Sequence, residues 1–205
     1  MNKIFCTAVL ALIVPVAASA ETLGACAPRR AIGAALGFLT ADVPMDPELA
    51  GVGRFGLATT TGTGLEAAVN HTFPIANEWS ITTEAGAGGM AVAQERDADG
   101  TYEFKKTGDS LTIQRLQVGL QHRRAGRFVC GYSSIAAGLY RYNYRGDTLR
   151  VPGIALSVGL EGARASSGTM FVELGVSVAL SALRSPTAAE LVGNLRPAIG
   201  WRFRF

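Results

Sequence analysis

The carboxyl-terminal stretch NLRPAIGWRFRF, residues 194–205, decides the fold of this chain. Large apolar side chains occupy every second position from 199 to 205, and glycine or arginine fills the positions between them. A period of two places alternate side chains on opposite faces of a β-strand. Because one face ends in Trp201, Phe203 and Phe205 while guanidinium groups point the other way, the pattern is typical of a strand with lipid outside and a polar interior.

The amino terminus has the three parts of a secretory signal peptide. Residues 1–3 carry a positive charge, residues 4–17 form a mostly apolar run, and Ala18-Ser19-Ala20 is a small-residue cleavage pattern. A membrane anchor is the alternative, but a spanning helix needs about 20 apolar residues. Cleavage after Ala20 is therefore expected. It removes Lys3 and lowers the formal charge from +3 to +2, a near-neutral balance that argues against nucleic acid as a partner.

Two cysteines remain after removal of the signal, Cys26 and Cys130. In an oxidising compartment they predict one disulfide. A pair of buried thiols is the alternative, because the sequence does not give the Cα separation, which is roughly 4.4–6.8 Å in a bridge. Residues 23–26, Leu-Gly-Ala-Cys, also loosely resemble the lipobox of acylated lipoproteins. Polar residues 21–22 separate this motif from the apolar run, so ordinary cleavage is the preferred interpretation.

The rest of the chain predicts strands rather than helices, because its apolar residues recur with period two. Short turns are expected at 74–78, 123–126 and 165–168, and longer polar stretches at 41–50, 95–107, 145–148 and 183–192. Short turns at one rim and longer loops at the other are typical of bacterial outer-membrane barrels. We expect an all-β fold, a transmembrane antiparallel up-and-down β-barrel of eight strands. The expected strands are 30–40, 55–73, 79–94, 108–122, 127–144, 149–164, 169–182 and 194–205.

Side-chain parity separates a lipid-facing surface from an interior surface. In the seventh expected strand, the even positions from 170 to 180 hold Met, Val, Leu, Val, Val and Leu, and the odd positions hold mainly small or polar residues. An unpaired charge on the lipid face is costly, so the charged parity is expected to face the lumen. The predicted interior charges are Glu66, Glu84, Arg115, Glu161, Glu173, Arg196 and Arg202. Eight strands enclose a space that side chains just fill, and we therefore expect these residues to form a packed ion-pair network.

Two features leave alternatives open. In the segment 127–144, Ile135 and Leu139 share one parity while Tyr140, Tyr142 and Tyr144 share the other. Either a β-bulge or interior tyrosines would account for this. The same alternation of apolar and polar residues also suits a soluble sandwich or lipocalin-like barrel, in which the apolar face points inward. The signal peptide, the terminal aromatic residue and the asymmetry of turns and loops favour the membrane barrel.

The chain resembles the small eight-stranded outer-membrane barrels of the OmpA/OmpX-like group, the outer membrane protein β-barrel domain. The resemblance rests on the architecture and on three local sequences, FPIANEWS at 73–80, AAGLYR at 136–141 and WRFRF at 201–205. It implies a signal peptide at 1–20, a periplasmic segment at 21–29 and a barrel domain at 30–205. It also implies location in the outer membrane of a Gram-negative bacterium, after export through the inner membrane.

The resemblance further implies partners. Trp201, Phe203 and Phe205 resemble the assembly signal that the barrel-assembly machinery reads, so this machinery and periplasmic chaperones are expected as transient partners. The other expected partners are outer-membrane lipid and lipopolysaccharide, and the protein is expected to be a monomer. An architecture of this kind indicates the fold and the cellular location of a protein more strongly than it indicates the biological function.

No catalytic, cofactor or metal site is predicted. The pattern G-x-G-x-x-G at 51–56 lacks the helix that a dinucleotide site requires after it. Lipid A deacylases are similar in size, but His71 and His122, the available imidazole bases, are expected beside periplasmic turns, away from lipid A in the outer leaflet. Neither clustered cysteines nor an acidic calcium loop occurs.

We therefore expect a non-enzymatic integral outer-membrane protein with an envelope-structural or surface-interaction role, exposed through four modest loops. The stretch 95–106 mixes positive and negative charges. One interpretation is a binding contact for lipopolysaccharide or a host ligand. The other is a solvated loop without a binding role. A small gated ion channel, opened when the interior ion pairs exchange partners, is the second interpretation. A lipid A-modifying enzyme is the third.

Overall fold

The computed structural model describes residues 26–44, 59–96, 102–103, 110–125, 129–144, 146–162, 168–180 and 191–205. The predicted signal peptide therefore lies outside the described residues. The strands are β1 (Ala31–Pro44), β2 (Thr59–Pro74), β3 (Trp79–Arg96), β4 (Tyr102–Glu103), β5 (Ser110–Ala125), β6 (Val129–Tyr144), β7 (Asp147–Gly162), β8 (Gly168–Leu180) and β9 (Leu191–Arg204). Within the described ranges, no helix is long and apolar enough to cross a membrane.

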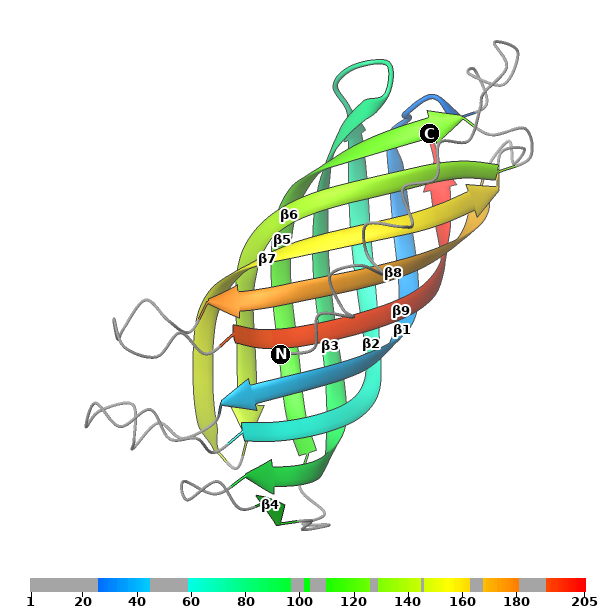
Figure 1. The fold of residues 1–205 in the computed structure, drawn as a ribbon. Coiled ribbons are helices and arrows are strands. Elements are labelled where there is room, and N and C mark those ends of the chain that lie inside the picture. Colours follow the sequence, from blue (N-terminus) through cyan, green and yellow to red (C-terminus); the bar gives the residue numbers. More distant parts are fainter. Residues whose placement is uncertain are drawn as a thin grey trace, which may run out of the picture.

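Eight of these strands form a closed antiparallel barrel. The sheet runs in the order β2-β1-β9-β8-β7-β6-β5-β3, and an additional pairing of β2 with β3 closes it. The last strand lies beside the first (Figure 1), with Ala31 opposite Arg204 and the amide of Phe205 donating to the carbonyl of Arg30 at 2.9 Å. The structure confirms the predicted fold class. Strand β4 lies outside the closed ring and pairs with the end of β3.

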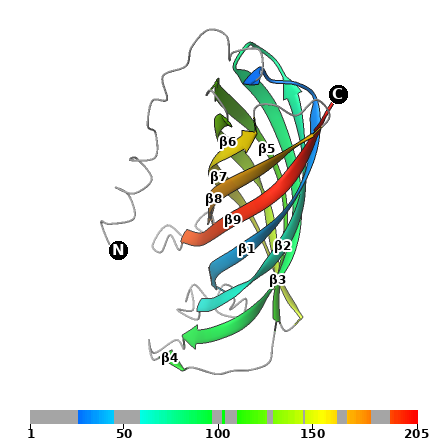
Figure 2. The same cartoon turned by 90° about the vertical axis from the view of Figure 1, so that its right-hand side faces the viewer.

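The two rims of the barrel differ in their connections. The carboxyl-terminal end, the start of β1 and the β2–β3 turn lie at one rim (Figure 1), which we call the turn rim. Strand β4 lies at the opposite end (Figure 2), which we call the loop rim. Of the connections at the loop rim, residues 45–58, 97–101, 104–109 and 181–190 lie outside the described residues.

Several sequence-based boundaries differ from the structure, since β1 continues to Pro44, β3 to Arg96, β8 begins at Gly168 and β9 begins at Leu191. Two of the predicted connections were wrong in kind. A turn was expected at 123–126, but β5 continues through Ala125, with Arg123 and Ala125 facing the interior on the same parity as Gln121. A longer polar loop was expected at 145–148, but Tyr144 pairs directly with Asp147. A two-residue connection needs backbone with positive φ, and Gly146 supplies it with a φ of 94°. The connection between β6 and β7 is thus a tight turn and not a loop.

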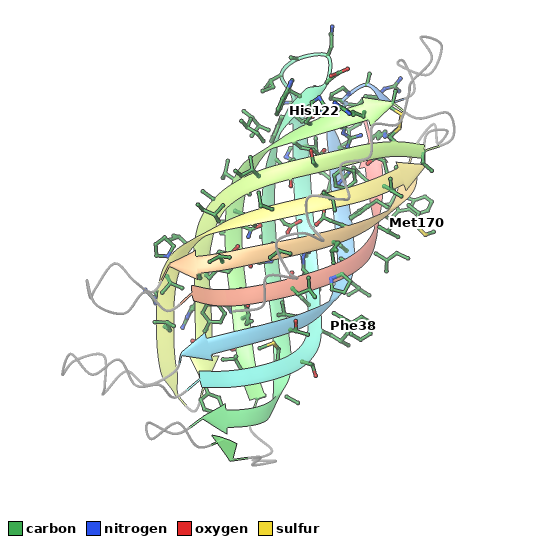
Figure 3. The ribbon with its side chains drawn as sticks, in the orientation of Figure 1. Phe38, His122 and Met170 are labelled. Atoms are coloured by element: carbon green, nitrogen blue, oxygen red, sulfur yellow. A yellow bond between two sulfur atoms is a disulfide. The ribbon has the colours of Figure 1, made fainter. Side chains whose placement is uncertain are left out.

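The outer wall is apolar over its whole circumference. Phe38 and Met170 point away from the wall (Figure 3), and their exposed fractions are 68% and 55%. Every strand of the ring contributes to this surface, including Leu36, Leu65, Val69, Leu116, Val118, Ile135, Leu139, Ile154, Leu160, Val172, Ile199 and Trp201. A soluble barrel would place such residues inside. The apolar parity therefore faces outward, as a lipid-embedded barrel requires.

The sixth strand is regular despite its mixed pattern. The pairing of β6 with β5 and β7 runs without a register shift, so there is no bulge in this strand. Tyr140, Tyr142 and Tyr144 are buried inside the barrel, whereas Ile135 and Leu139 face outward. The interior-tyrosine interpretation is correct. A register shift does occur in the pairing of β2 with β3, where Thr61 lies opposite Gln94 and Gly62 opposite Val92.

Candidate functional site

The middle of the lumen holds three carboxylates and two guanidinium groups. Arg115 Nη2 lies 2.6 Å from Glu66 Oε1, and Arg115 also pairs with Glu84. Arg196 Nη2 lies 2.5 Å from Glu173 Oε1 and 3.2 Å from Glu84 Oε1, and its Nη1 lies 3.4 Å from Glu66 Oε1. We call these five residues the central charge cluster. Each carboxylate contacts at least one arginine, which offsets the high cost of burying a lone charge.

A glycine in β3 makes the central charge cluster possible. In the register of the sheet, Gly86 lies between Ala68 of β2 and Arg115 of β5. A Cβ atom at Gly86 would lie 2.9 Å from both Arg115 Nε and Glu66 Oε1. The missing side chain therefore lets the guanidinium group pass over β3 and reach a carboxylate two strands away.

A second cluster lies nearer the turn rim and centres on Glu161 of β7. Arg123 Nη1 lies 2.6 Å from Glu161 Oε1, and Arg202 and Arg204 also pair with this carboxylate. The guanidinium carbon of Arg202 lies 4.6 Å from the ring centroid of Phe171 and 5.1 Å from that of Tyr132. We call Glu161, Arg123, Arg202 and Arg204 the rim charge cluster. Stacking on two rings adds cation–π attraction to its ion pairs.

The seven predicted interior charges are therefore divided between two clusters. Tyr132 lies between them, because its hydroxyl donates to Glu173 Oε2 at 3.0 Å while its ring contacts Arg202. Arg123 was missed because the sequence analysis assigned it to a turn. The available signal was its parity, since Gln117, Gln121 and Arg123 share the interior face of β5.

A small cavity lies along the central charge cluster. Its volume is about 60 Å³, and its lining includes Glu66, Arg115, Glu173, Arg196 and Arg202. A water molecule requires roughly 10–15 Å³ of such volume. The cavity is thus large enough for a few water molecules and too small for an organic substrate.

The lumen at the loop rim is apolar, which the sequence analysis did not expect. A hydrophobic cluster crosses the barrel there, and we call it the lumen plug. Its buried members are Leu39, Ala41, Met90, Leu111, Ile113, Tyr140, Tyr142, Tyr144, Val151 and Ala179. The expectation of a polar interior holds for the middle of the barrel but not for this end. The signal was present in β5, where Leu111 and Ile113 share the parity of Arg115.

The two histidines lie on the outer face near the turn rim, and Figure 3 shows His122 at that rim. His122 Nε2 lies 3.0 Å from Glu78 Oε2, and its ring centroid lies 4.7 Å from that of Trp79. The ring centroids of His71 and Phe73 lie 3.8 Å apart. Among the described residues, there is no group of three or more side chains suited to holding a metal ion. The G-x-G-x-x-G stretch at 51–56 lies outside the described residues.

The predicted disulfide is present. The Cα atoms of Cys26 and Cys130 lie 5.5 Å apart, and Cys26 packs with Cys130 and Ala125 inside the turn rim. The bridge ties the segment before β1 to the start of β6. At the same rim, Trp201, Phe203 and Phe205 of the predicted assembly signal are all exposed on the outer face.

Comparison with known proteins gives a likeness of fold. No protein-family model and no curated protein sequence matches the chain. Among solved structures, Neisserial surface protein A (NspA) is similar, with 10% identity, a TM-score of 0.57, and coverage of 87% of this chain and 99% of that one. OprG from Pseudomonas aeruginosa is 11% identical over 88% of this chain and 98% of its own, with a TM-score of 0.48.

The N-terminal β-barrel domain of Pseudomonas aeruginosa OprF is also similar, with 11% identity, a TM-score of 0.45, and coverage of 87% and 99%. At 10% identity, the likeness to NspA is one of fold. The closed ring of eight antiparallel strands, the apolar outer wall and the likeness to NspA agree. The chain has the fold of the small eight-stranded outer-membrane β-barrel proteins.

Proposed function

We propose that this protein is a non-enzymatic, non-conducting barrel of the outer membrane that acts through its loop rim. The lumen plug is the observation that carries this proposal. It places Tyr142 and Leu111, both fully buried, across the interior at the loop rim. A continuous water path would have to pass through this apolar layer and then through both charge clusters. The barrel is therefore best suited to serve as a solid scaffold for its loops.

The position of the two histidines argues against an enzymatic activity that modifies lipid A. Both lie on the outer face at the turn rim, whereas lipid A would lie at the loop rim. His122 is engaged with Glu78 and Trp79, and His71 lies beside Phe73 and Phe205. A general base must lie within hydrogen-bond reach of the group that it activates. This arrangement leaves the loop rim without an imidazole base among the described residues.

The channel interpretation is the second candidate, and planar-bilayer recording separates the two. Refolded protein is first checked for heat-modifiable gel mobility and strand-rich circular dichroism. We expect no reproducible conductance from the wild-type barrel. A positive control is the variant Leu111→Ala/Tyr142→Ala/Arg115→Ala, which removes bulk from the plug and from the central charge cluster. Reproducible unitary conductance from the folded wild-type protein would overturn the non-conducting part of the proposal.

The loop rim is proposed as the surface that meets lipopolysaccharide or another envelope or host component. The stretch 95–106 carries both positive and negative charges, and its first two residues are the last two of β3, which ends at Arg96. Replacing 97–101 and 104–109 by short Gly/Ser connections tests this role, because the barrel itself should persist. Loss of binding to lipopolysaccharide-containing vesicles or to cells would indicate surface interaction. Unchanged binding together with weakened envelope integrity would indicate a structural role.

The exposed aromatic residues Trp201, Phe203 and Phe205 are proposed as the signal that the barrel-assembly machinery recognises. The carboxyl-terminal Phe205 is exposed beside Arg30 at the turn rim. Phe205→Ala should reduce the assembled protein in cells and leave refolding into detergent unchanged. Equal loss in both settings would indicate that Phe205 stabilises the barrel and is not read as a signal.

A further inference from the structure

The turn rim is strongly basic. Its described residues include Arg29, Arg30, Arg123, Arg124, Arg202 and Arg204, against Glu78 and Glu161. The rim charge cluster uses the three interior arginines of this set to neutralise Glu161. The other three, Arg29, Arg30 and Arg124, are exposed. No described acidic side chain lies within ion-pair distance of any of these three.

Two of the exposed arginines extend from the lipid-facing surface. Arg30 precedes β1 on the parity of the outward Ile32, and its guanidinium carbon lies 5.4 Å from the ring centroid of Phe73. Arg124 follows Leu120 and His122 on the outward parity of β5. These arginines therefore leave the barrel on its outer wall and not into its lumen.

Aromatic side chains mark the depth of these arginines. Trp79, Trp201, Phe203 and Phe205 are all exposed on the outer face at the turn rim. Aromatic girdles of this kind lie at the level of the lipid headgroups. Arg30 is flanked by Phe73 and Phe205, and Arg124 lies two positions beyond the His122–Trp79 contact. The guanidinium groups are thus held at headgroup depth, where a lipid phosphate is the nearest anionic partner that the membrane supplies.

We propose that Arg30 and Arg124 form a binding surface for anionic phospholipid headgroups in the membrane leaflet at the turn rim, which faces the periplasm. A guanidinium group donates two parallel hydrogen bonds to a phosphate, which makes arginine well suited to this contact. The long arginine side chains allow the apolar stem to lie along the wall while the charge reaches the headgroup. This inference rests on membrane insertion of the barrel and not on the role of the loop rim.

The chain carries a built-in reporter for this surface. Its two tryptophans both lie at the turn rim, and Trp79 lies on β3, adjacent to the Phe73 strand on one side and to the Arg124 strand on the other. In a Trp201→Phe background, the fluorescence of Trp79 is measured in liposomes of phosphatidylcholine. Brominated phosphatidylglycerol or brominated phosphatidylcholine is then added in increasing proportion. The ratio of the two quenching curves gives the relative binding of the anionic lipid.

We expect phosphatidylglycerol to be preferred at Trp79 by at least about fivefold, because a basic residue at a membrane surface contributes roughly that factor. Arg30→Gln and Arg124→Gln should each lower the preference, and the double variant should bring it close to one. Raising the salt concentration should weaken it in the wild-type protein. Arg141→Gln is the matched control, since Arg141 is an exposed arginine on the loop-rim half of β6, and it should leave the preference unchanged.

Equal quenching by the two lipids in the wild-type protein, or a preference that survives in the double variant, would overturn the proposal. Quenching by phosphatidylcholine reports insertion independently of headgroup charge. Its absence for every variant would overturn membrane insertion itself, and the proposal with it. Heat-modifiable mobility of each variant shows that the barrel is folded, so that loss of the preference is assigned to the missing charge.

Discussion

Arg115 and Glu66 form an ion pair across an intervening strand, with Nη2 and Oε1 2.6 Å apart above Gly86 of β3. Their side chains are 7% and 1% exposed, so water does little to screen the pair. The same guanidinium group also holds Glu84. One arginine thereby joins carboxylates from two strands, β2 and β3, to a third strand, β5, and fixes the middle of the barrel.

Arg115→Met should destabilise the barrel by about 3–5 kcal/mol, because the three buried carboxylates of the central charge cluster would then share a single arginine, Arg196. Glu66→Gln should cost less, because the remaining Glu84 and Glu173 still match Arg115 and Arg196 in number. Equilibrium unfolding by urea in lipid vesicles, followed by tryptophan fluorescence, measures both free energies. The opposite order of the two variants would contradict the charge balance that we assign to the central charge cluster.

Gly119→Ala should destabilise the protein by about 1–3 kcal/mol, the usual range for overpacking. A Cβ atom there would collide with the carbonyl oxygen of Ile135 and with Ala136 on the neighbouring strand β6. Gly175→Ala is the matched control in β8, because its Cβ atom would meet nothing closer than Arg196 Nε at 3.6 Å. Thermal unfolding of the two variants in detergent tests the difference. Similar midpoints would show that β5 and β6 separate easily at this point.

Removal of the disulfide should lower the free energy of unfolding by about 2–5 kcal/mol, because the bridge joins residues 104 positions apart and restricts the unfolded chain. The variant Cys26→Ser/Cys130→Ser is compared with wild-type protein in guanidinium chloride, with and without reductant. Reductant should destabilise the wild-type protein and leave the double variant unaffected. Labelling of free thiols in unreduced wild-type protein would show that the bridge is not formed in solution.

Gly146→Ala should cost about 1–2 kcal/mol, since an L-residue strains at the positive φ of 94° that the β6–β7 turn adopts. Gly193→Ala serves as the control, because that glycine has no positive φ and its Cβ atom would meet no atom within 4 Å. Denaturant midpoints of the two variants give the comparison. An equal effect would indicate that the connection relaxes into the longer loop that its polar sequence suggested.

The sequence by itself determined the strands and their two faces, because a period of two is a local property, and the signal peptide and the asymmetry of turns and loops favoured the membrane barrel over a soluble one. The alternation around Trp201 and Phe203 already separates lipid from lumen, and a shift by one residue would place arginines in the membrane. The interior parity of Glu66 and Arg115 follows from the same rule. The short connection before Trp79 likewise follows from local turn residues.

Only the tertiary structure decided which interior residues meet. Arg115 reaches Glu66 because the register of β2, β3 and β5 places Gly86 between them. The register between strands that are distant in the sequence cannot be inferred from any single segment. The two charge clusters and the lumen plug arise in the same way, from the heights at which closed strands align. Parity tells which face a side chain occupies, whereas closure of the barrel sets its height and therefore its partners.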